Sequence, residues 1–583
     1  MILPLKLALA PLNPTVGDLA GNRALIEGAI RDAVGAGVQL LILPELVMTG
    51  YPPRDLLLHG GFIEDVMSQV ERIASGVPDG LTVLIGTPWR EGTGTLLTNS
   101  VVVARGGPRG GGIVERYDKR LLPNYDVFDE LRYFRPGDRP VVIEVGGVRV
   151  GLAVCEDLWR GVDAHTDDRY AGAPDPIAEL KAAGAQLVAV PSASPFVRGK
   201  SVTQGRIIAQ QCERLGIAIA SVNQCGANDD LIFDGHCALY EPGPFGAMLT
   251  ASGVPFESGL VLTEFEPGRE PRPLEADPFE EADPSGLLWD ALVLGVRDYC
   301  RKSGFSKVTL GVSGGIDSAV CAVLGAAAVG GDNLTGVAMP SRYSSEGSLT
   351  DAEEMCRRIG CGYTVRSIEA GHDALSDDLD ETLRGLGVES GAGGLTDENL
   401  QSRLRGLTMM AVSNATGALL LTTGNKCEHA TGYATLYGDQ NGGLAPIADL
   451  LKGEVYGLAR WINANPERGG FDGPPIPEST ITKPPSAELR PDQRDSDSLP
   501  DYDLLDEIVA RYVDGKEDAR AIEADLVSRG AIEADELRRV VRLIDLNEYK
   551  RFQLAIALKV RPVAFGRGRR RPIVQRYRPF NGN

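Results

Sequence analysis

A loop of small residues between an apolar segment and an alanine-rich segment is the feature that most constrains how this chain can fold. The apolar residues 308–310 predict a buried strand, and residues 319–328 predict a helix. The residues that connect them are Gly311, Val312, Ser313, Gly314, Gly315, Ile316, Asp317 and Ser318. Such a turn presents backbone N–H groups and the positive end of a helix dipole, which suit a phosphate group. The residues alone also leave open a simple glycine–serine turn capped by Asp317.

The order Ser-Gly-Gly-Ile-Asp-Ser (313–318) after a strand resembles the pyrophosphate loop of the ATP pyrophosphatases. Those enzymes cleave ATP to AMP and pyrophosphate by adenylating their substrate. The resemblance implies that residues 311–318 hold the phosphates of ATP, while Asp317 could hold a metal ion. Because several activities share this motif, the rest of the chain has to select among them.

Length and composition exclude several classes of protein. A chain of 583 residues predicts two or three domains. The net charge of −21 argues against a general nucleic-acid or membrane-surface binder, so we expect neither partner. No apolar run approaches the roughly 20 residues of a membrane span, and the apolar start lacks the features of a signal peptide. The nine cysteines are scattered without metal-type pairs, which predicts a cytoplasmic protein without disulfides or structural zinc.

The first half alternates between predicted strands and helices. The apolar segments that predict strands are residues 5–10, 40–43, 81–86, 100–104, 148–154, 185–190 and 217–222. Residues 22–34 have helical spacing. Several of these strands are apolar on both faces, as in a sheet that is covered on both sides. The pattern predicts an α/β or α-β-β-α layered domain.

Three polar residues of the first half, Glu45, Lys119 and Cys155, each follow an apolar strand or a turn. A cysteine in such a place can act as a nucleophile, a carboxylate can take its proton, and a lysine can stabilise an oxyanion. Together these groups suffice to hydrolyse an amide. Taken singly, each has a simpler explanation: core packing for the cysteine, a helix cap for the glutamate and a solvated surface position for the lysine.

The sequence around these three residues resembles the glutaminase branch of the nitrilase superfamily. The matching motifs are Leu-Pro-Glu-Leu (43–46), Tyr-Asp-Lys-Arg-Leu-Leu-Pro (117–123) and Ala-Val-Cys-Glu-Asp-Leu-Trp (153–159). The resemblance implies that Glu45 is the general base, that Lys119 stabilises the oxyanion, and that Cys155 is the nucleophile. A thioester formed at Cys155 would release ammonia.

The same resemblance places glutamine-binding groups at Tyr125, Ser194 and Lys200. Two hydroxyl groups and an ammonium can contact the polar ends of a free amino acid. Residues 160–176 form a polar segment that is longer than in the compact family pattern. The sequence therefore does not predict which residues form the lip of the glutamine pocket.

A proline-rich acidic segment separates the two halves of the chain. Residues 263–284 contain five prolines and many carboxylates but few apolar side chains, which predicts an extended linker. We therefore predict a glutaminase-like domain at residues 1–264, a linker at residues 265–284, and a second domain at residues 285–583.

The second half also alternates between strands and helices. Strands are predicted at residues 308–310, 334–339, 363–368 and 419–423, and helices between them, with a glycine-rich mobile loop at residues 382–396. This succession predicts a doubly wound parallel sheet, a Rossmann-like arrangement that binds ligands at the carboxyl ends of its strands. Asp317 and Glu428 both follow apolar strands, so they could share a Mg²⁺ ion bound to ATP.

Three motifs of the second half resemble those of the NAD synthetases. They are Thr-Thr-Gly-Asn-Lys (422–426), Gly-Tyr-Ala-Thr-Leu-Tyr-Gly-Asp (432–439) and Lys-Pro-Pro-Ser-Ala-Glu-Leu-Arg-Pro (483–491). With its nitrilase-like first half, the chain as a whole resembles the glutamine-dependent NAD⁺ synthetases. The resemblance implies that Thr423 contacts ATP. It also implies that Asn399, Glu428 and Lys550 contact deamido-NAD⁺, whereas Cys427 is expected to be a structural thiol.

The resemblance implies a ligase that amidates deamido-NAD⁺ to NAD⁺ through an adenylated intermediate. Its substrates would be deamido-NAD⁺, ATP and L-glutamine, with Mg²⁺ as cofactor, and its subunits would form a homo-oligomer. Because ammonium is a poor nucleophile, we expect a protected route for ammonia between the two sites. Two alternatives are a carbon–nitrogen hydrolase with a regulatory nucleotide-binding domain and a scaffold without catalysis.

Three segments near the end of the chain carry further expectations. Residues 484–502 are polar and proline-rich; composition predicts disorder, whereas the resemblance implies that they order over bound substrate. Residues 504–557 predict an acidic helical bundle. The basic tail, residues 567–578, suggests nucleic-acid binding, but the net charge of the chain favours an anion contact or a subunit interface.

Overall fold

The computed structural model describes residues 3–92, 96–108, 110–160, 169–170, 172–491, 493 and 499–580. They form two compact units that meet in the sequence between Leu287 and Leu288. The predicted linker, residues 265–284, lies within the first unit. Its role as a linker, and the domain boundaries predicted around it, remain predictions.

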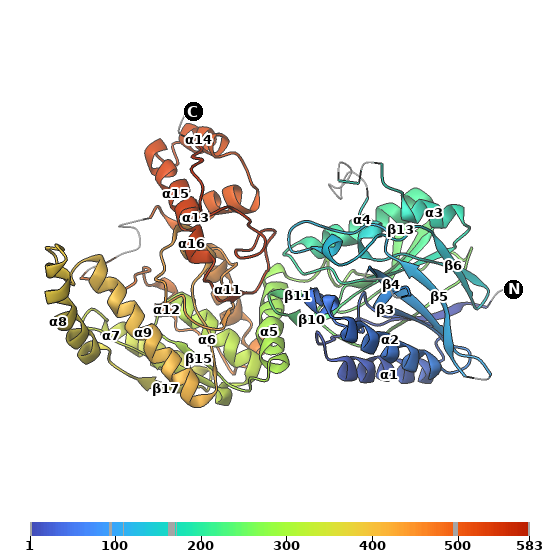
Figure 1. Cartoon of the computed structure of the whole chain (residues 1–583), viewed down its shortest axis with the longest axis horizontal. Coiled ribbons are helices and arrows are strands. Elements are labelled where there is room, and N and C mark those ends of the chain that lie inside the picture. The colour runs from blue at the N-terminus through green and yellow to red at the C-terminus, as the bar shows by residue number, and fades with distance from the viewer. Residues whose placement is uncertain are drawn as a thin grey trace. The chain divides into compact units, whose positions relative to one another are not determined.

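The first unit contains two six-stranded sheets (Figure 1). The first sheet has the order β14 (Val261–Phe265), β1 (Leu5–Leu9), β2 (Leu40–Ile42), β3 (Thr82–Arg90), β4 (Leu97–Arg105), β5 (Gly112–Asp118). The second has the order β13 (Gly246–Ser252), β12 (Cys237–Gly243), β9 (Ala218–Asn223), β8 (Leu187–Ser192), β7 (Val148–Leu152), β6 (Val141–Val145). A hairpin of β10 (Cys225–Asn228) and β11 (Leu231–Asp234) stands apart.

Alternation along the strands explains why the sheets stack. Leu5, Leu7 and Leu9 belong to a core shared by both sheets, whereas Ala8 and Ala10 face a second core on the outside of the first sheet. Because successive side chains of a strand point to opposite faces, strands that are apolar at every position must be covered twice. The apolar runs that predicted buried strands are thereby explained.

Helices cover the outer face of each sheet. Contacts to the first sheet come from α2 (Gly60–Ser75), which packs beside α1 (Leu19–Gly35), and contacts to the second come from α3 (Pro176–Ala182) and α4 (Lys200–Leu215). Figure 1 shows α1 and α2 on one side of the strands and α3 and α4 on the other. The predicted α-β-β-α sandwich is confirmed.

The proline-rich segment is anchored to this first unit. Phe279 is 2% exposed and packs against the buried His236, with ring centroids 4.4 Å apart and the ring planes tilted by 60°. The Leu274 amide also donates to the carbonyl of Leu249 in β13 (2.8 Å). The segment therefore packs against the second sheet, although its composition predicted few core contacts.

The second unit is built on a parallel four-stranded sheet with the order β17 (Gly362–Val365), β16 (Leu334–Ala338), β15 (Val308–Gly311), β18 (Leu419–Leu420). The chain runs outward from β15 to β17 and then returns to place β18 on the other side of β15. Such a reversal opens a crevice at the carboxyl ends of β15 and β18, the strands on either side of the reversal. The predicted doubly wound sheet is confirmed.

The helices of this unit alternate with the strands and then form a C-terminal bundle. They are α5 (Pro284–Lys302), α6 (Ile316–Val329), α7 (Glu346–Arg358), α8 (Glu369–Gly385), α9 (Leu395–Thr416), α10 (Lys426–Thr431), α11 (Lys452–Ala464), α12 (Glu478–Thr482), α13 (Tyr502–Val509), α14 (Ala519–Ser528), α15 (Ala534–Leu546) and α16 (Glu548–Arg551). Helices α8 and α9 take up both ends of the predicted glycine-rich loop, which is reduced to residues 386–394.

Two details of the C-terminal region bear on the predictions, and the first of them differs from what was expected. Ile556–Ala557 forms β20 rather than helix, because these residues pair in parallel with β19 (Leu444–Ala445). In the basic tail, Arg569 and Arg571 form ion pairs with Asp545 of α15 at 3.1 and 2.9 Å. The charges of these two arginines are therefore paired with a carboxylate of the same unit.

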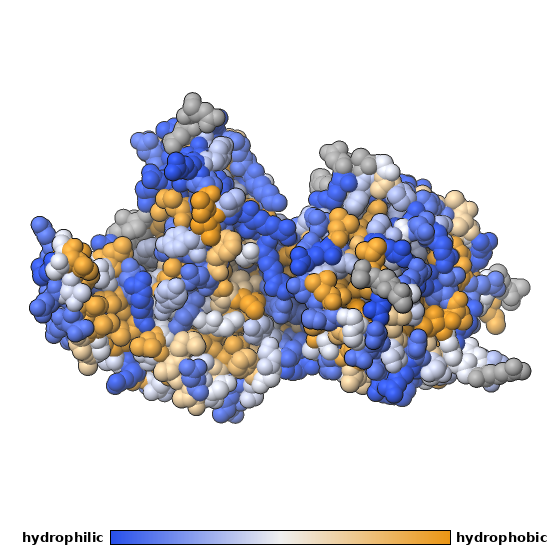
Figure 2. Space-filling model, in the orientation of Figure 1, coloured by the Kyte–Doolittle hydropathy of each residue, from blue (hydrophilic) through white to orange (hydrophobic). Residues whose placement is uncertain are grey.

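The surface and the thiols agree with the composition. The face drawn in Figure 2 mixes hydrophilic and hydrophobic residues on both units. No helix among the described residues is long and apolar enough to cross a membrane. All nine cysteines are free thiols in the structure.

Candidate active sites

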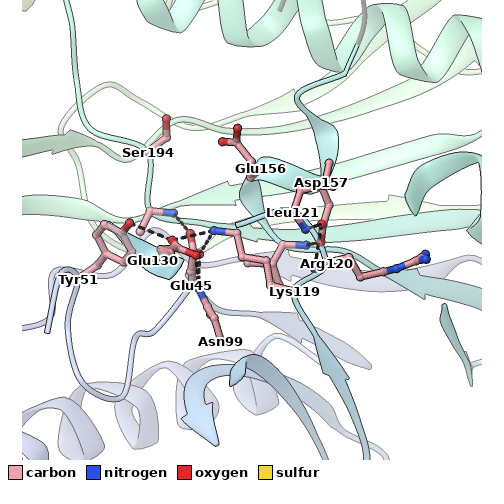
Figure 3. Close-up of polar contacts among 12 residues, drawn as sticks. Glu45, Tyr51, Asn99, Lys119, Arg120, Leu121, Glu130, Glu156, Asp157 and Ser194 are labelled. Atoms are coloured by element: carbon pink, nitrogen blue, oxygen red, sulfur yellow. Dashed lines mark hydrogen bonds and ion pairs between the residues drawn. The ribbon is translucent and has the colours of Figure 1, made fainter. Parts of the chain in front are cut away.

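The first unit brings a lysine and two glutamates together in its core (Figure 3). Glu45 follows β2 and Lys119 follows β5, so the ends of two strands of the first sheet deliver them. The Lys119 Nζ donates to Glu45 Oε1 at 2.7 Å and to Glu130 Oε1 at 2.9 Å. Lys119 is 0% and Glu45 1% exposed. The ammonium is thus held between two buried carboxylates.

Several polar groups hold the two carboxylates in place. The Asn99 amide and the Ala193 N–H donate to Glu45 at 2.7 and 2.9 Å. The Tyr51 hydroxyl donates to Glu130 at 3.0 Å. Sequence reasoning did not identify Glu130, which lies in a short 3₁₀ turn (Glu130–Arg132) and follows no predicted strand.

Cys155 begins the 3₁₀ turn Cys155–Leu158, and two residues separate it from the end of β7. Its φ of +42° lies in the left-handed region, which residues other than glycine seldom adopt. A conformation of this kind costs on the order of 1–3 kcal/mol and persists only where the surroundings determine it. The turn therefore sets the direction of the thiol at the end of the strand.

The charges in this core affect one another. Burial raises the pKa of the Cys155 thiol well above its usual value, the Glu45 carboxylate raises it further, and Lys119 opposes the rise. Burial also raises the pKa of Glu130 to about 7. Burial lowers the pKa of Lys119, but Glu130 and Glu45 outweigh that effect, so this pKa lies well above its usual value. The site thus contains a thiol, a buried ammonium and a carboxylate that can take a proton.

The predicted glutamine-binding residues surround the same turn. The Tyr125 hydroxyl donates to Glu156 at 3.0 Å. The Ser194 amide donates to Asn223 at 2.7 Å, one residue after the Ala193 that contacts Glu45. The Lys200 Nζ lies 5.6 Å from the centroid of the Trp159 ring. These residues therefore gather around the Cys155 turn.

A buried glutamate next to the thiol was missed by sequence reasoning. Glu156 is 2% exposed and accepts hydrogen bonds from Tyr125 and, at 2.7 Å, from the Tyr170 hydroxyl. Burial raises the pKa of Glu156 above its usual value. Tyr170 belongs to the segment 160–176, of which residues 161–168 and 171 lie outside the described residues.

The second unit contains a cavity of about 600 Å³ at the carboxyl ends of its central strands. Its lining includes every residue of the 311–318 loop except Gly314. Gly314 has a φ of +73°, and a Cβ there would lie 2.2 Å from the carbonyl oxygen of Ser348. The loop therefore follows a path that a side chain at this position would block, and it leads into the first turn of α6.

Asp317 and Glu428 both line this cavity and both lie near Lys452. The Lys452 Nζ contacts Asp317 and lies 3.7 Å from Glu428 Oε1. The Asn425 amide donates to Asp317 at 3.0 Å. Sequence reasoning placed the two carboxylates at one sheet edge but did not identify Lys452, whose only signal is its place after an apolar run.

The other predicted residues of the second unit, Thr423, Asn399 and Lys550, also line the cavity. The Lys550 Nζ donates to the carbonyls of Gly432 and Ala434, both at 2.7 Å, and the Asn399 amide oxygen accepts from Thr435.

Cys427 lies beside the cavity rather than in its lining. Its thiol donates to Asp506 at 2.8 Å.

The proline-rich segment after α12 closes one wall of the cavity. Lys483 donates to Ser348 at 2.9 Å, and the Glu488 carboxylate accepts from the hydroxyls of Ser345 and Ser348. Residues 484–491 are thus ordered against the start of α7. Residues 492 and 494–498 of the predicted substrate-covering segment lie outside the described residues.

Sequence models of two protein families match the chain. The family described as "Carbon-nitrogen hydrolase" matches residues 6–264, and the family described as "NAD synthase" matches residues 288–554. A glutamine-dependent NAD(+) synthetase from Xanthomonas campestris is 41% identical over 98% of this chain and 98% of its own length. One from Synechocystis is 39% identical over 98% of this chain and 99% of its own.

Solved structures give the same result over the whole chain. The glutamine-dependent NAD⁺ synthetase from Acinetobacter baumannii, solved in complex with ADP, is similar with a TM-score of 0.73 at 32% identity, covering 98% of this chain and 99% of its own. The one from Cytophaga hutchinsonii has a TM-score of 0.79 at 22% identity, covering 98% of both chains, which supports the fold.

We expect the Cys155 thiol to stay protonated at neutral pH. Its pKa is raised, so the thiolate forms only as the pH rises above the usual range for a thiol. The measurement is the ultraviolet absorbance of thiolate as a function of pH in the native protein and in a Cys155→Ala variant. Subtracting the second curve from the first removes the signal of the other cysteines. A difference signal already complete at neutral pH would contradict the prediction.

Proposed function

This chain belongs to the family of glutamine-dependent NAD(+) synthetases, and we propose that its two units divide the family's reaction between them. The reaction amidates deamido-NAD⁺ to NAD⁺ with ammonia from glutamine, through an adenylated intermediate, and gives AMP, pyrophosphate and glutamate. The observation that carries the proposal is the separation of two complete sets of groups. A thiol, a carboxylate and a buried ammonium lie in the first unit, and a phosphate-type loop and two carboxylates line the cavity of the second.

In the first unit, the Cys155 sulfur attacks the side-chain carbonyl carbon of glutamine while Glu45 takes the thiol proton. The tetrahedral oxyanion is stabilised by the Lys119 ammonium, and this interaction is strong because the lysine is fully buried. Collapse of the intermediate breaks the C–N bond, and Glu45 returns the proton to the leaving ammonia. Glu45 then activates the water that hydrolyses the thioester to glutamate. The Glu130 carboxylate holds Lys119 throughout.

Recognition of glutamine requires groups for both of its charged ends. We assign the α-carboxylate to Ser194 and Lys200, and the amide end to the neighbourhood of Cys155. The α-ammonium needs a carboxylate, and the buried Glu156 beside the nucleophile supplies one, with Tyr125 already bonded to it. Buried charges are costly unless they are paired, so a cationic ligand suits this carboxylate.

In the second unit, the loop 311–318 and Thr423 hold ATP, and Asn399, Glu428 and Lys550 contact deamido-NAD⁺. The nicotinate carboxylate attacks the α-phosphorus of ATP, pyrophosphate leaves, and ammonia then displaces AMP. The N–H groups at the start of α6 and the Lys452 ammonium, which lines the same cavity, would stabilise the phosphate charge.

The residues of this cavity fit a Mg²⁺ ion. Asp317 and Glu428 offer hard oxygen ligands on one cavity wall, and their shared contact with Lys452 shows that together they attract a cation. Mg²⁺ bound there with ATP would neutralise phosphate charge. Among the described residues, no group of three or more His, Cys, Asp or Glu side chains could hold a metal by itself, so the phosphates would complete the site.

Four expectations rest on the family resemblance and remain proposals. They are a protected route for ammonia, assembly into a homo-oligomer, a cytoplasmic location, and closure of the segment after Lys483 over bound substrate. The alternative of a hydrolase with a regulatory nucleotide-binding domain is not favoured, because the relatives match both halves of the chain.

We predict that Cys155→Ala loses glutamine-dependent NAD⁺ synthesis by on the order of 10⁴-fold or more, because the nucleophile is gone. Synthesis from ammonium salts should stay near the native rate, since that nitrogen source bypasses the first unit. The measurement is NAD⁺ and AMP formed with each nitrogen donor. Loss of both activities in a folded variant would refute the assignment of the two sites to separate units.

We predict that Asp317→Ala loses synthesis with either nitrogen donor, because phosphate and metal binding precede both. The same substitution at Asp332, which is exposed and lies outside the cavity lining, is the matched control and should leave both activities unchanged. Both variants are compared in NAD⁺ and AMP formation over a range of Mg²⁺ concentrations. Full activity of Asp317→Ala would remove this residue from the metal site.

We predict that Glu156→Gln raises the KM for glutamine by about 10- to 100-fold, the loss expected when a hydrogen bond to a charged group is removed. Hydrolysis of glutaramate, which has the same amide but no α-ammonium, should change little. The measurement is ammonia release from both compounds. An equal loss with both would show that Glu156 shapes the site but does not recognise the ammonium.

A further inference from the structure

The Asp157 carboxylate, two residues after the thiol, lies at the centre of four hydrogen bonds. Its Oδ1 accepts from the amides of Leu121 (2.9 Å) and Arg120 (3.2 Å). Its Oδ2 accepts from the Tyr117 hydroxyl (2.8 Å) and the Val154 amide (2.9 Å). The side chain is 1% exposed, and Figure 3 shows it directed at Arg120 and Leu121 beside Lys119.

These donors come from two segments that are distant in the sequence but meet at the site. Val154 immediately precedes Cys155, after strand β7 of the second sheet. Arg120 and Leu121 immediately follow Lys119, after strand β5 of the first sheet. One carboxylate therefore ties the turn of the nucleophile to the loop of the oxyanion-stabilising lysine. Among the hydrogen bonds of the described residues, Asp157 takes part in none that involves the substrate-facing Glu45 or Glu156.

The same bonds act on the strained turn. Cys155 has a left-handed φ of +42°, and the Asp157 carboxylate caps the N–H group of Val154 just before it. A carboxylate at the third position of a helical turn that accepts the N-cap amide fixes the start of that turn. The conformation of the thiol-bearing residue thus depends on a side chain within its own turn.

We propose that Asp157 is a positioning residue that holds the Cys155 sulfur at its working distance from the Lys119 ammonium. The proposal rests on the proposed function of the first unit. Attack by sulfur and stabilisation of the oxyanion occur on the same carbon and its oxygen, so both groups must be correctly placed at once. A misplacement of about 1 Å can cost on the order of 100-fold in rate.

The bonding pattern predicts what a minimal substitution does. The two backbone amides after Lys119 and the Val154 amide can only donate, so the carboxylate must accept on both oxygens. Asp157→Asn keeps the size of the side chain but offers one accepting oxygen, and its NH₂ group then faces an N–H donor. It therefore releases one of the two segments without leaving a cavity.

The experiment compares Asp157→Asn, Tyr117→Phe and Asp175→Asn in the full chain. Tyr117→Phe removes one donor of the four. Asp175→Asn is the matched control, since Asp175 also accepts a backbone amide, that of Ala178 at the start of α3, but does not join the two segments. The readouts are kcat and KM for glutamine hydrolysis, and the pH profile of Cys155 alkylation by iodoacetamide. Synthesis from ammonium salts reports that the second unit is intact.

For Asp157→Asn we expect kcat to fall about 100-fold while KM for glutamine changes little, because the reacting groups move and the binding groups do not. The alkylation profile should differ from the native one, since a displaced sulfur changes its distances to Glu45, which raises the pKa of the thiol, and to Lys119, which lowers it. The kcat and the alkylation profile of Tyr117→Phe should lie between those of Asp157→Asn and the native protein. Asp175→Asn should match the native protein in both.

The proposal is overturned if Asp157→Asn keeps the native kcat and the native alkylation profile. It is also overturned if kcat and KM for glutamine both deteriorate while the profile stays native, because that result indicates general damage to the pocket. If the native protein released no ammonia from glutamine, the proposed function would fail instead. The alkylation profile would then decide whether Asp157 positions the thiol.

Discussion

The first unit depends on one buried ammonium shared by two carboxylates. Moving charges out of water is expensive, and removal of one partner of a buried ion pair typically costs about 3–5 kcal/mol because the other charge is left uncompensated. Lys119, Glu45 and Glu130 must therefore fold together, and each comes from a different segment of the chain. The double-sheet core around them excludes water. The resulting low dielectric strengthens the pull of the ammonium on developing negative charge.

The second unit uses a lysine between two carboxylates in a different setting. Lys452 is 2% exposed, but the side chains of Asp317 and Glu428 are 17% and 19% exposed on the cavity wall. A ligand in the cavity can therefore reach both carboxylates directly. The arrangement suits a site that receives a cation with its substrate, whereas the Lys119 cluster suits a site whose charges are permanent.

Periodicity and strand ends were sufficient to predict the alternating strands and helices of both units and the places of Glu45, Cys155 and Asp317, because apolar runs are local signals. The pattern left the layers of the first unit open between α/β and α-β-β-α, and the sandwich was predicted with the nitrilase resemblance. Glu130 and Lys452 could not be found in this way. The role of each depends on a partner that only the fold brings close, and Lys452 and Asp317 are 135 residues apart in the sequence. No local sequence pattern indicates such a contact. The short strand β20 was missed for the same reason, since its pairing with β19 outweighs the helical propensity around it.

The two sites also differ in how the backbone serves them, and the difference follows from their ligands. A phosphate chain is large and highly charged, so the second site needs an open crevice and a loop of mostly small residues, in which Gly314 allows the close approach to Ser348. An amide carbonyl is small and neutral, and it gains charge only as it reacts. The first site therefore needs little space but a fixed geometry. A strained cysteine held by hydrogen bonds on its own turn meets that need, and a flexible nucleophile in an open crevice would not.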